Sequence, residues 1–348
     1  MSRRLARGWM ALLVALVAGC ILPSGPLAAA AHSGTRTPPP ATVRLGGEEY
    51  VEARAVFARF GLKPVVLEAG RRLRFESAWS KIELEADRRE ALVNGLRVFL
   101  GAPVLVHRRT LHLSKIDADR LFTPILRPAT YAASAPALKT IVVDAGHGGR
   151  DTGTQNPRLK LDEKGVTLDV ARRLQVLLER EGYQVVLTRT DDRFVDLEER
   201  AAIANRAKAD LFVSIHFNAV ANAPTVRGTE TYIMTPRHHA STQPERDKSM
   251  VPTLYPGNAR DVWNAVLGYQ IHRQLLDQLG TFDRGLKRAR FKVLTLLDCP
   301  GVLIESAYLS NDAEAEKVRT ASYRDRLAEA IAAGIRAYGV QLEAAKKG

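Results

Sequence analysis

Cysteine is nearly absent from this chain, and the shortage excludes a fold held together by disulfide bonds. The 348 residues include two cysteines, Cys20 and Cys299. If Cys20 is removed or modified with the leader described below, Cys299 stands alone and no disulfide can form. Cys299 precedes Pro300 at the start of an apolar run, which favours a small buried hydrophobic residue over a catalytic thiol.

Aromatic residues are also scarce. Phe, Trp and Tyr make up 6% of the sequence, and the arginines lack the interleaved aromatic residues that RNA-binding modules use. The formal net charge of +13 still favours an acidic partner, such as anionic lipid or a carboxylate-bearing polymer. We therefore expect no nucleic-acid partner.

The first apolar run is too short to span a membrane. It covers residues 9–18 after three arginines, which is the size of the apolar core of a signal peptide. Residues 16–20 resemble a bacterial lipoprotein cleavage box, in which Cys20 would carry the lipid; residues 28–31 offer small side chains for ordinary cleavage. We predict a signal peptide at 1–31 and export to the cell envelope, in the periplasm or at the cell surface. Membrane attachment through a lipidated Cys20 is favoured over ordinary cleavage.

Composition divides the next part of the chain into a tether, a small domain and a linker. Residues 32–42 are rich in Ser, Thr and Pro and predict a flexible tether. Residues 43–126 mix alternating segments with one helix-like stretch, and Asn94-Gly95 between apolar residues is a strong hairpin signal. This predicts a small α+β domain, which resembles the stalk domain at the front of copper amine oxidases but carries no metal motif. Residues 127–137 predict a second linker.

Strand-like and helix-like patterns alternate from residue 138 to 342, and residues 343–348 are expected to be a tail. The strand-like runs are 140–144, 184–188, 211–216, 229–234, 292–296 and 302–305. Helical patterns lie near 166–180, 196–207, 261–279 and beyond 322. Strands separated by helices predict an α/β domain with a mostly parallel sheet and helices on both faces. The polar stretch 235–258 predicts a surface loop near the cleft, with a lid or inhibitory segment as the alternative.

Acidic and imidazole side chains come at the ends of several predicted elements. His147 and His216 follow strand-like runs, Glu163 precedes the first amphipathic helix, and Glu305 ends the last strand. Because the carboxyl ends of parallel strands line the ligand crevice, we expect these side chains to lie together. Two histidines and a carboxylate can hold zinc with one open position, and a further carboxylate can act as a base. The pattern therefore predicts a metallohydrolase.

Two other interpretations of the Gly-His-Gly-Gly loop at 146–149 fail. An esterase would also need a Gly-x-Ser-x-Gly elbow, which the sequence lacks. A phosphate-binding loop would continue into Gly-Lys-Ser/Thr, which is also absent here.

Taken together, the motifs resemble a known enzyme family. They are the run 141–149 with Asp151, Glu163-Lys164 before a helix, and the segments 214–219, 283–287, 302–305 and 309–311. Their order is similar to that in the zinc-dependent N-acetylmuramoyl-L-alanine amidases of bacterial cell walls, the type 3 amidase group. The resemblance covers about residues 140–338.

The resemblance implies a metal site, a catalytic residue and a substrate. One zinc ion per chain would be held by His147, Glu163 and His216, with Glu305 as the catalytic carboxylate. The substrate would be peptidoglycan, cut between the lactyl group of N-acetylmuramic acid and L-alanine. A zinc peptidase acting on the stem peptide and a catalytically inactive wall-binding module remain the alternatives, and the need for a protein activator is left open.

We expect three further residues, Asn218, Arg288 and Arg290, to contact the substrate. The two arginines precede the last strands, where they would face stem-peptide carboxylates. The chain departs from the family pattern at Thr167, where Asn is usual, and at Phe217, where a small residue is usual. These departures concern the surroundings of the ligands rather than the ligands themselves.

Overall fold

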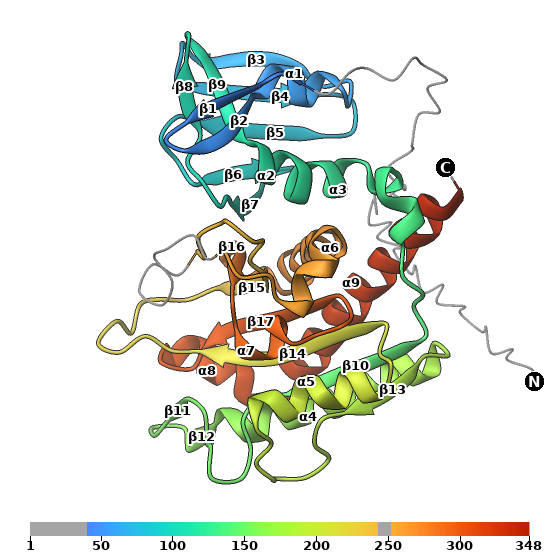
Figure 1. Ribbon diagram of the computed structural model, residues 1–348. Helices are drawn as coiled ribbons and strands as arrows, with labels where there is room; N and C mark the ends of the chain where they lie inside the picture. Colours follow the sequence, from blue (N-terminus) through green and yellow to red (C-terminus); the bar gives the residue numbers. More distant parts are fainter. Residues whose placement is uncertain (1–39, 243–251, 348) are drawn as a thin grey trace, which may run out of the picture.

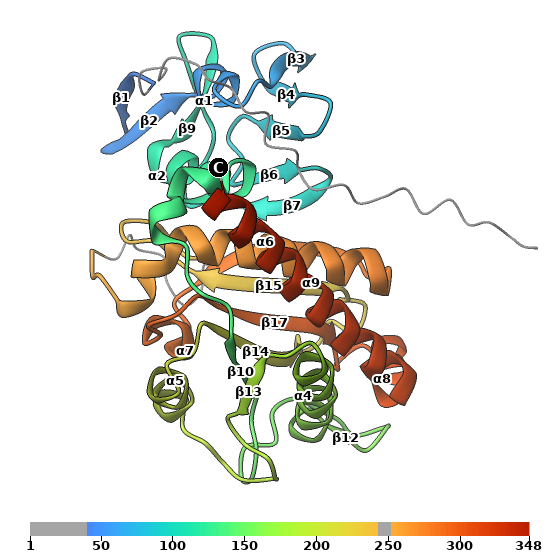
Figure 2. The ribbon, with the colours of Figure 1, turned by 90° about the vertical axis from the view of Figure 1, so that its right-hand side faces the viewer.

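The computed structural model describes residues 40–242 and 252–347 (Figure 1). The expected signal peptide at 1–31 and nearly all of the expected tether lie outside the described residues. Within the described residues, no helix is both long enough and apolar enough to cross a membrane. A smaller N-terminal region lies above a larger C-terminal region in Figures 1 and 2.

The N-terminal region is rich in strands and carries short helices. Its elements are β1 (Thr42–Leu45), β2 (Glu48–Glu52), α1 (Ala53–Ala58), β3 (Lys63–Glu68), β4 (Arg72–Glu76), β5 (Lys81–Glu85), β6 (Glu90–Val93), β7 (Leu96–Phe99), β8 (Leu105–His107), β9 (Thr110–Ser114), α2 (Lys115–Asp117), η1 (Ala118–Phe122) and α3 (Thr123–Leu126). The predicted hairpin joins β6 to β7, and Asn94 and Gly95 both have positive φ, as a two-residue hairpin turn requires.

The C-terminal region alternates strands and helices. Its elements are β10 (Thr140–Ala145), β11 (Gln155–Asn156), β12 (Leu161–Asp162), α4 (Glu163–Arg180), β13 (Gln184–Leu187), α5 (Leu197–Arg206), β14 (Leu211–Asn218), β15 (Thr229–Met234), η3 (Pro256–Arg260), α6 (Asp261–Leu279), β16 (Asp283–Ala289), α7 (Lys292–Thr295), β17 (Gly301–Tyr308), α8 (Asp312–Arg319) and α9 (Ala321–Lys347).

The sheet of the C-terminal region is mostly parallel and covered on both faces, so the predicted fold class is confirmed. Strands β13, β10, β14 and β17 run parallel, β15 is antiparallel to β17, and β16 is parallel to β15. One face packs on α4, α6 and α9 in a large apolar core. A smaller apolar cluster joins the other face to α5 and α7.

The sheet does not stop at the boundary between the two regions. Strand β7 pairs with β16 through Leu286 and Val98, so eleven strands form one sheet in the order β13-β10-β14-β17-β15-β16-β7-β6-β5-β4-β3. Leu286 and Val98 also belong to the same apolar core. The N-terminal region therefore covers what would otherwise be the exposed edge of β16.

Several segments differ from the sequence-based expectation, among them the following four. Residues 128–134 of the expected linker form the 3-10 helix η2 (Pro128–Ser134), where Ser134 Oγ accepts a hydrogen bond from Trp263 Nε1 at 3.1 Å. The expected strand at 292–296 is the helix α7, and β16 was not predicted. Helix α9 continues to Lys347, through most of the expected tail.

Candidate metal centre and active site

The loop after β10 turns sharply to present His147. Gly148 and Gly149 have φ of +129° and +58°. His147 itself has φ of +62°, and residues other than glycine seldom adopt a positive φ. Backbone strain of this kind concentrates at functional sites, where the surrounding structure holds it in place.

Three donor atoms converge beside this loop. His147 Nε2 lies 3.0 Å from Glu163 Oε1 and 3.2 Å from His216 Nδ1. The distance between His216 Nδ1 and Glu163 Oε1 is also 3.2 Å. Glu163 begins α4 and is buried, whereas both histidines are half-buried, so the cluster opens on the histidine side.

Two glycines leave room for these side chains. A Cβ atom on Gly146 would lie 2.3 Å from the ring of His216. On Gly153, whose φ is +65°, a Cβ atom would lie 2.6 Å from Glu163 Oε2 and 2.7 Å from His147 Cδ2. Any larger residue would collide with the donors, so the backbone is shaped around the three side chains.

The donor set fits a zinc ion. Imidazole nitrogens and a carboxylate oxygen are common zinc ligands, and atoms bound to a tetrahedral zinc stand about 3.3–3.6 Å apart. The observed separations of 3.0–3.2 Å are within a few tenths of an ångström of that spacing. Asp151 Oδ2 lies 2.9 Å from His147 Nδ1, the carboxylate–histidine pairing that commonly orients a metal-bound imidazole.

Hydrogen bonds within the cluster also set the charge of Glu163. Burial opposes ionisation of this carboxyl, but hydrogen bonds from His147 and His216 outweigh burial and hold the pKa of Glu163 well below its usual range. Phe217, one of the departures from the family pattern, donates its backbone N–H to Glu163 Oε1 at 2.9 Å. The carboxylate is therefore present as an anion, the form that binds a metal.

Buried charged side chains, which the sequence did not reveal, hold the backbone of the loop that carries His147. Arg200 donates to Asp144 Oδ1 and to the carbonyl oxygens of Ala145 and His147, each at 2.7 Å. Arg189 donates to the carbonyl oxygen of Gly146 at 2.9 Å. Both arginines and Asp144 are buried.

Thr167, the other departure from the family pattern, also supports this loop. Its hydroxyl donates to the carbonyl oxygen of Gly146 at 2.8 Å and lies 3.1 Å from Arg189 Nη2. A shorter side chain than asparagine therefore still reaches the loop.

Glu305 lies next to the cluster, one strand along the sheet. It pairs with His216 between the parallel strands β14 and β17, so the two side chains leave the same face at the same level. Glu305 is half-buried. This position places a second carboxylate, besides that of Glu163, next to the three donors.

Asn218 belongs to a polar cluster beyond Glu305. Its Nδ2 lies 3.4 Å from Glu230 Oε2 and 3.3 Å from the hydroxyl oxygen of Tyr308. Glu230 pairs with Glu305 between the antiparallel strands β15 and β17. Asn218 is thus near the candidate site.

Arg288 and Arg290, by contrast, lie between the two regions of the molecule. Arg288 is 1% exposed and its Nη1 donates to Asp117 Oδ1 of the N-terminal region at 2.6 Å. Arg290 Nη2 donates to the carbonyl oxygens of Pro236 and His239, at 3.1 and 2.7 Å. The structure therefore gives both arginines partners within the chain and does not bring them to the three donors.

Residues 235–242 are the described first part of the expected loop 235–258. At His239 this segment is buried rather than exposed. This histidine is fully buried, and burial lowers its pKa to about 4. Its Nε2 lies 3.1 Å from Ser114 Oγ, and Arg89 donates to the carbonyl oxygen of Ala240 at 3.2 Å. Residues 235–242 thus join the two regions.

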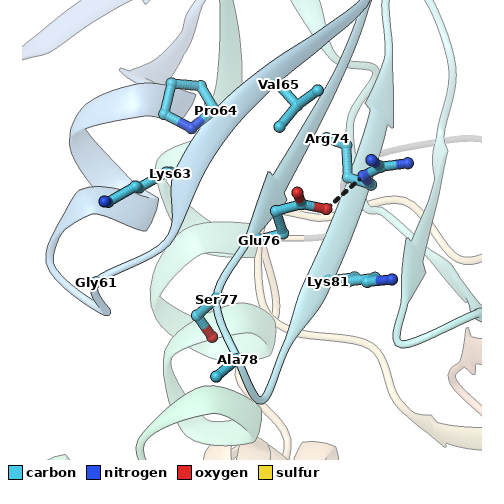
Figure 3. Close-up of a pocket in the computed structure, with 9 residues that line it drawn as sticks. All are labelled: Gly61, Lys63, Pro64, Val65, Arg74, Glu76, Ser77, Ala78 and Lys81. Carbon is cyan, nitrogen blue, oxygen red and sulfur yellow. Dashed lines mark hydrogen bonds and ion pairs between the residues drawn. The ribbon is translucent and has the colours of Figure 1, made fainter.

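Cys299 and the shallow hollow of Figure 3 contribute no chemistry to the site. Burial raises the pKa of Cys299 to about 12, which keeps the thiol protonated. The hollow lies on β3 to β5, at the far end of the long sheet, where Lys63, Arg74, Glu76 and Lys81 are among its lining residues. None of the three donor residues lines it.

Comparison with known proteins identifies a family. A family model described as N-acetylmuramoyl-L-alanine amidase matches residues 141–337. The uncharacterized protein YqiI of Bacillus subtilis is 38% identical over 214 residues, which cover 61% of this chain and 91% of YqiI.

Two named amidases are also similar, although the chain spans only about half of their length. The amidase LytC of Bacillus subtilis is 30% identical over 86% of this chain and 56% of its own length. The amidase AmiC of Neisseria meningitidis serogroup B is 34% identical over 57% of this chain and 52% of its own length. Among solved structures, the amidase AmiC2 of Nostoc punctiforme is 33% identical over 59% of this chain and 99% of the solved chain, with a TM-score of 0.49.

Proposed function

Since the chain belongs to the N-acetylmuramoyl-L-alanine amidase family, and so among the peptidoglycan hydrolases, we propose that it is a zinc enzyme of this specificity. It hydrolyses the amide bond between the lactyl group of N-acetylmuramic acid and the L-alanine of the stem peptide. The convergence of two imidazole nitrogens and a carboxylate oxygen within 4.8 Å of one another carries the proposal.

His147, Glu163 and His216 are the proposed zinc ligands. Three protein ligands leave a fourth position open, as catalytic zinc sites do. When bound, zinc polarises the scissile carbonyl and lowers the pKa of water to about 7. Asp151 orients His147 through its Nδ1, and the arginines beneath the loop fix the position of the His147 backbone.

Glu305 is the proposed proton carrier. Its carboxylate takes a proton from water as the water oxygen bonds to the carbonyl carbon. It then gives that proton to the nitrogen of L-alanine as the carbon–nitrogen bond breaks. The products are a glycan with a free lactyl carboxylate and a stem peptide with a free amino terminus.

The identity of the products tests the proposal. Purified full-length protein is incubated with soluble muropeptides, and the products are analysed by mass spectrometry. We expect an intact stem peptide beginning with L-alanine and a glycan without peptide. Cleavage inside the stem would instead support the zinc peptidase, and a zinc-loaded protein without products would support the inactive wall-binding module.

We further propose that the enzyme works in the cell envelope, where its substrate lies, attached through a lipidated Cys20. Cys20 falls outside the described residues, and the proposal rests on its likeness to a lipoprotein cleavage box. Cys20→Ala should move the protein from the membrane fraction to the soluble fraction and abolish labelling by a fatty-acid analogue. If the parent protein takes up no label, ordinary signal cleavage at 28–31 replaces the lipoprotein proposal.

A further inference from the structure

Glu230, beside Glu305, is the centre of a cluster of cations and hydroxyl groups. Its side chain is 2% exposed. Oε1 accepts hydrogen bonds from Arg284 Nε and Lys287 Nζ, both at 2.8 Å, and from the Tyr308 hydroxyl at 2.6 Å. Oε2 accepts from the Tyr232 hydroxyl at 2.6 Å.

The cluster carries more positive than negative charge. Burial opposes ionisation of Glu230, but Lys287 and the hydroxyl donors hold its pKa at about 2, so it is an anion. One carboxylate faces two cations, which leaves a local charge of about +1 from these three side chains. Glu230 takes one of the three ammonium hydrogens of Lys287, so the lysine keeps capacity for another acceptor.

The two cations are fixed in place but open to solvent. The side chains of Lys287 and Arg284 are 13% and 31% exposed, against 2% for Glu230. Lys287 Nζ lies 5.8 Å from the centre of the Tyr232 ring and 5.4 Å from that of Phe99, which belongs to the N-terminal region. An anchored, partly exposed ammonium loses little conformational entropy when it binds an anion.

The order of strands places this cluster directly beside the candidate active site. His216, Glu305 and Glu230 stand side by side on β14, β17 and β15, and Lys287 is on the next strand, β16. Neighbouring strands are about 4.8 Å apart, and Lys287 is in register with Tyr232, two residues beyond Glu230. Two strand spacings across and two residues along therefore put roughly 12 Å between the backbones at Glu305 and Lys287. A bound peptide that leaves Glu305 across the sheet therefore passes Lys287.

We propose that Lys287 and Arg284 bind a stem-peptide carboxylate, with Glu230 as the positioning residue that holds both cations. This inference rests on the proposed amidase function. The acceptor is the free α-carboxylate of the γ-linked D-glutamate that follows L-alanine. Two residues of extended chain span about 7 Å, and the lysine side chain spans most of the rest, so the carboxylate comes within reach of a lysine whose backbone is about 12 Å away.

The test compares a stem peptide that keeps this carboxylate with one that has a carboxamide there. Free stem pentapeptides with D-glutamate or D-isoglutamine in second position are titrated into the full-length protein by calorimetry. The kcat/KM values are measured on the matching disaccharide muropeptides. The parent should prefer the carboxylate by about 10- to 100-fold, the usual worth of a hydrogen bond to a charged group.

Lys287→Met should lower this preference at least several-fold, mainly through Kd and KM, because methionine keeps the length of the side chain and removes its charge, while Arg284 remains. Arg284 still pairs with Glu230 in this variant, so the fold should survive. Lys287→Arg should restore most of the preference. Lys81→Met is the matched control, because Lys81 is an exposed lysine at the far end of the sheet.

The inference is overturned if the parent shows equal Kd and kcat/KM values for the carboxylate and carboxamide forms. It is also overturned if Lys287→Met keeps the full preference for the carboxylate. Hydrolysis without preference would remove this inference and leave the amidase function standing. If the zinc-loaded parent binds the carboxylate peptide selectively but releases no stem peptide from muropeptides, the carboxylate site stands and the amidase function is wrong.

Discussion

Gly153 shows how closely the backbone is fitted to the proposed metal site. Its φ is +65°, and an added Cβ atom would lie 2.6 Å from Glu163 Oε2, which leaves no room for a side chain. Gly153→Ala should therefore lower zinc affinity about 10- to 100-fold, the usual effect of disturbing the residues around a metal ligand. Zinc titration against a competing chelator gives this measurement.

Gly165→Ala is the control for this prediction. Gly165 lies on α4 two residues beyond Glu163, is exposed, and has nothing within 4 Å of the added Cβ. The substitution should leave zinc affinity unchanged and stabilise the helix by about 0.5–1 kcal/mol. If Gly153→Ala binds zinc like the control, the crowding argument is wrong.

The sequence could predict the site residues that follow a recognisable strand, but not those whose partners are distant in the sequence. His147, His216 and Glu305 follow apolar strand-like runs, so their position at one edge of the sheet could be expected. Asp144 and Arg200 could not, because an aspartate and an arginine 56 positions apart give no pattern before the fold brings them to 2.7 Å. The ion pair of Arg288 could not be predicted either, because its partner Asp117 lies in the other region of the chain.

Strands and helices were hardest to predict from the sequence where charged residues interrupt an apolar pattern. Strand β16 carries an aspartate, two arginines and a lysine, and their partners, such as Glu230 and Asp117, come from elsewhere in the chain. The run at 292–296 is short and contains three apolar residues, and such a run fits a buried strand and a buried helix equally well. The hairpin at 91–98 was predictable because Asn-Gly specifies its own turn.

Helix α6 begins with a destabilising charge at Asp261. Burial raises the pKa of Asp261 to about 6. When the pKa of an acid is higher in the folded than in the unfolded state, its ionisation lowers the free energy of unfolding. This loss begins near the unfolded pKa of about 4 and reaches its full size above the folded pKa of about 6. Asp261→Asn removes this cost and should stabilise the protein by up to about 3 kcal/mol at pH 8, because one pKa unit is worth about 1.4 kcal/mol.

Denaturant unfolding at pH 8 and below pH 4 checks this prediction. The gain should vanish at the lower pH, where aspartic acid is protonated in both states. Asp277→Asn on the exposed side of the same helix is the control and should change little at either pH. A gain that does not depend on pH would point to a cause other than the charge of Asp261.

Across the whole molecule, the two regions are joined more closely than the expected linker suggests. Sheet pairing, a common apolar core and the buried Asp117–Arg288 pair all cross the boundary. Removing one member of a buried pair leaves an uncompensated charge, at a cost of about 3–5 kcal/mol. Asp117→Ala and Arg288→Met should each destabilise the protein by about this much, and the double variant by less than their sum.

Denaturant unfolding of the two single variants and the double variant gives the coupling energy. Glu316→Gln, which removes an exposed ion pair with Arg319, should leave the unfolding midpoint nearly unchanged. Strict additivity of the Asp117 and Arg288 substitutions would show that the pair does not link the two regions.

The measurement that most directly tests the account is zinc content and turnover on the same preparations of the parent, Glu305→Gln and His216→Ala. The parent should hold about one zinc ion and release stem peptide from muropeptides. Glu305→Gln should keep the zinc and lose about 10²–10⁴ in rate, because glutamine cannot accept the proton. His216→Ala should lose both zinc and activity. A Glu305→Gln protein with near-normal turnover, or one that is inactive and free of metal, would contradict the division between three ligands and one proton carrier.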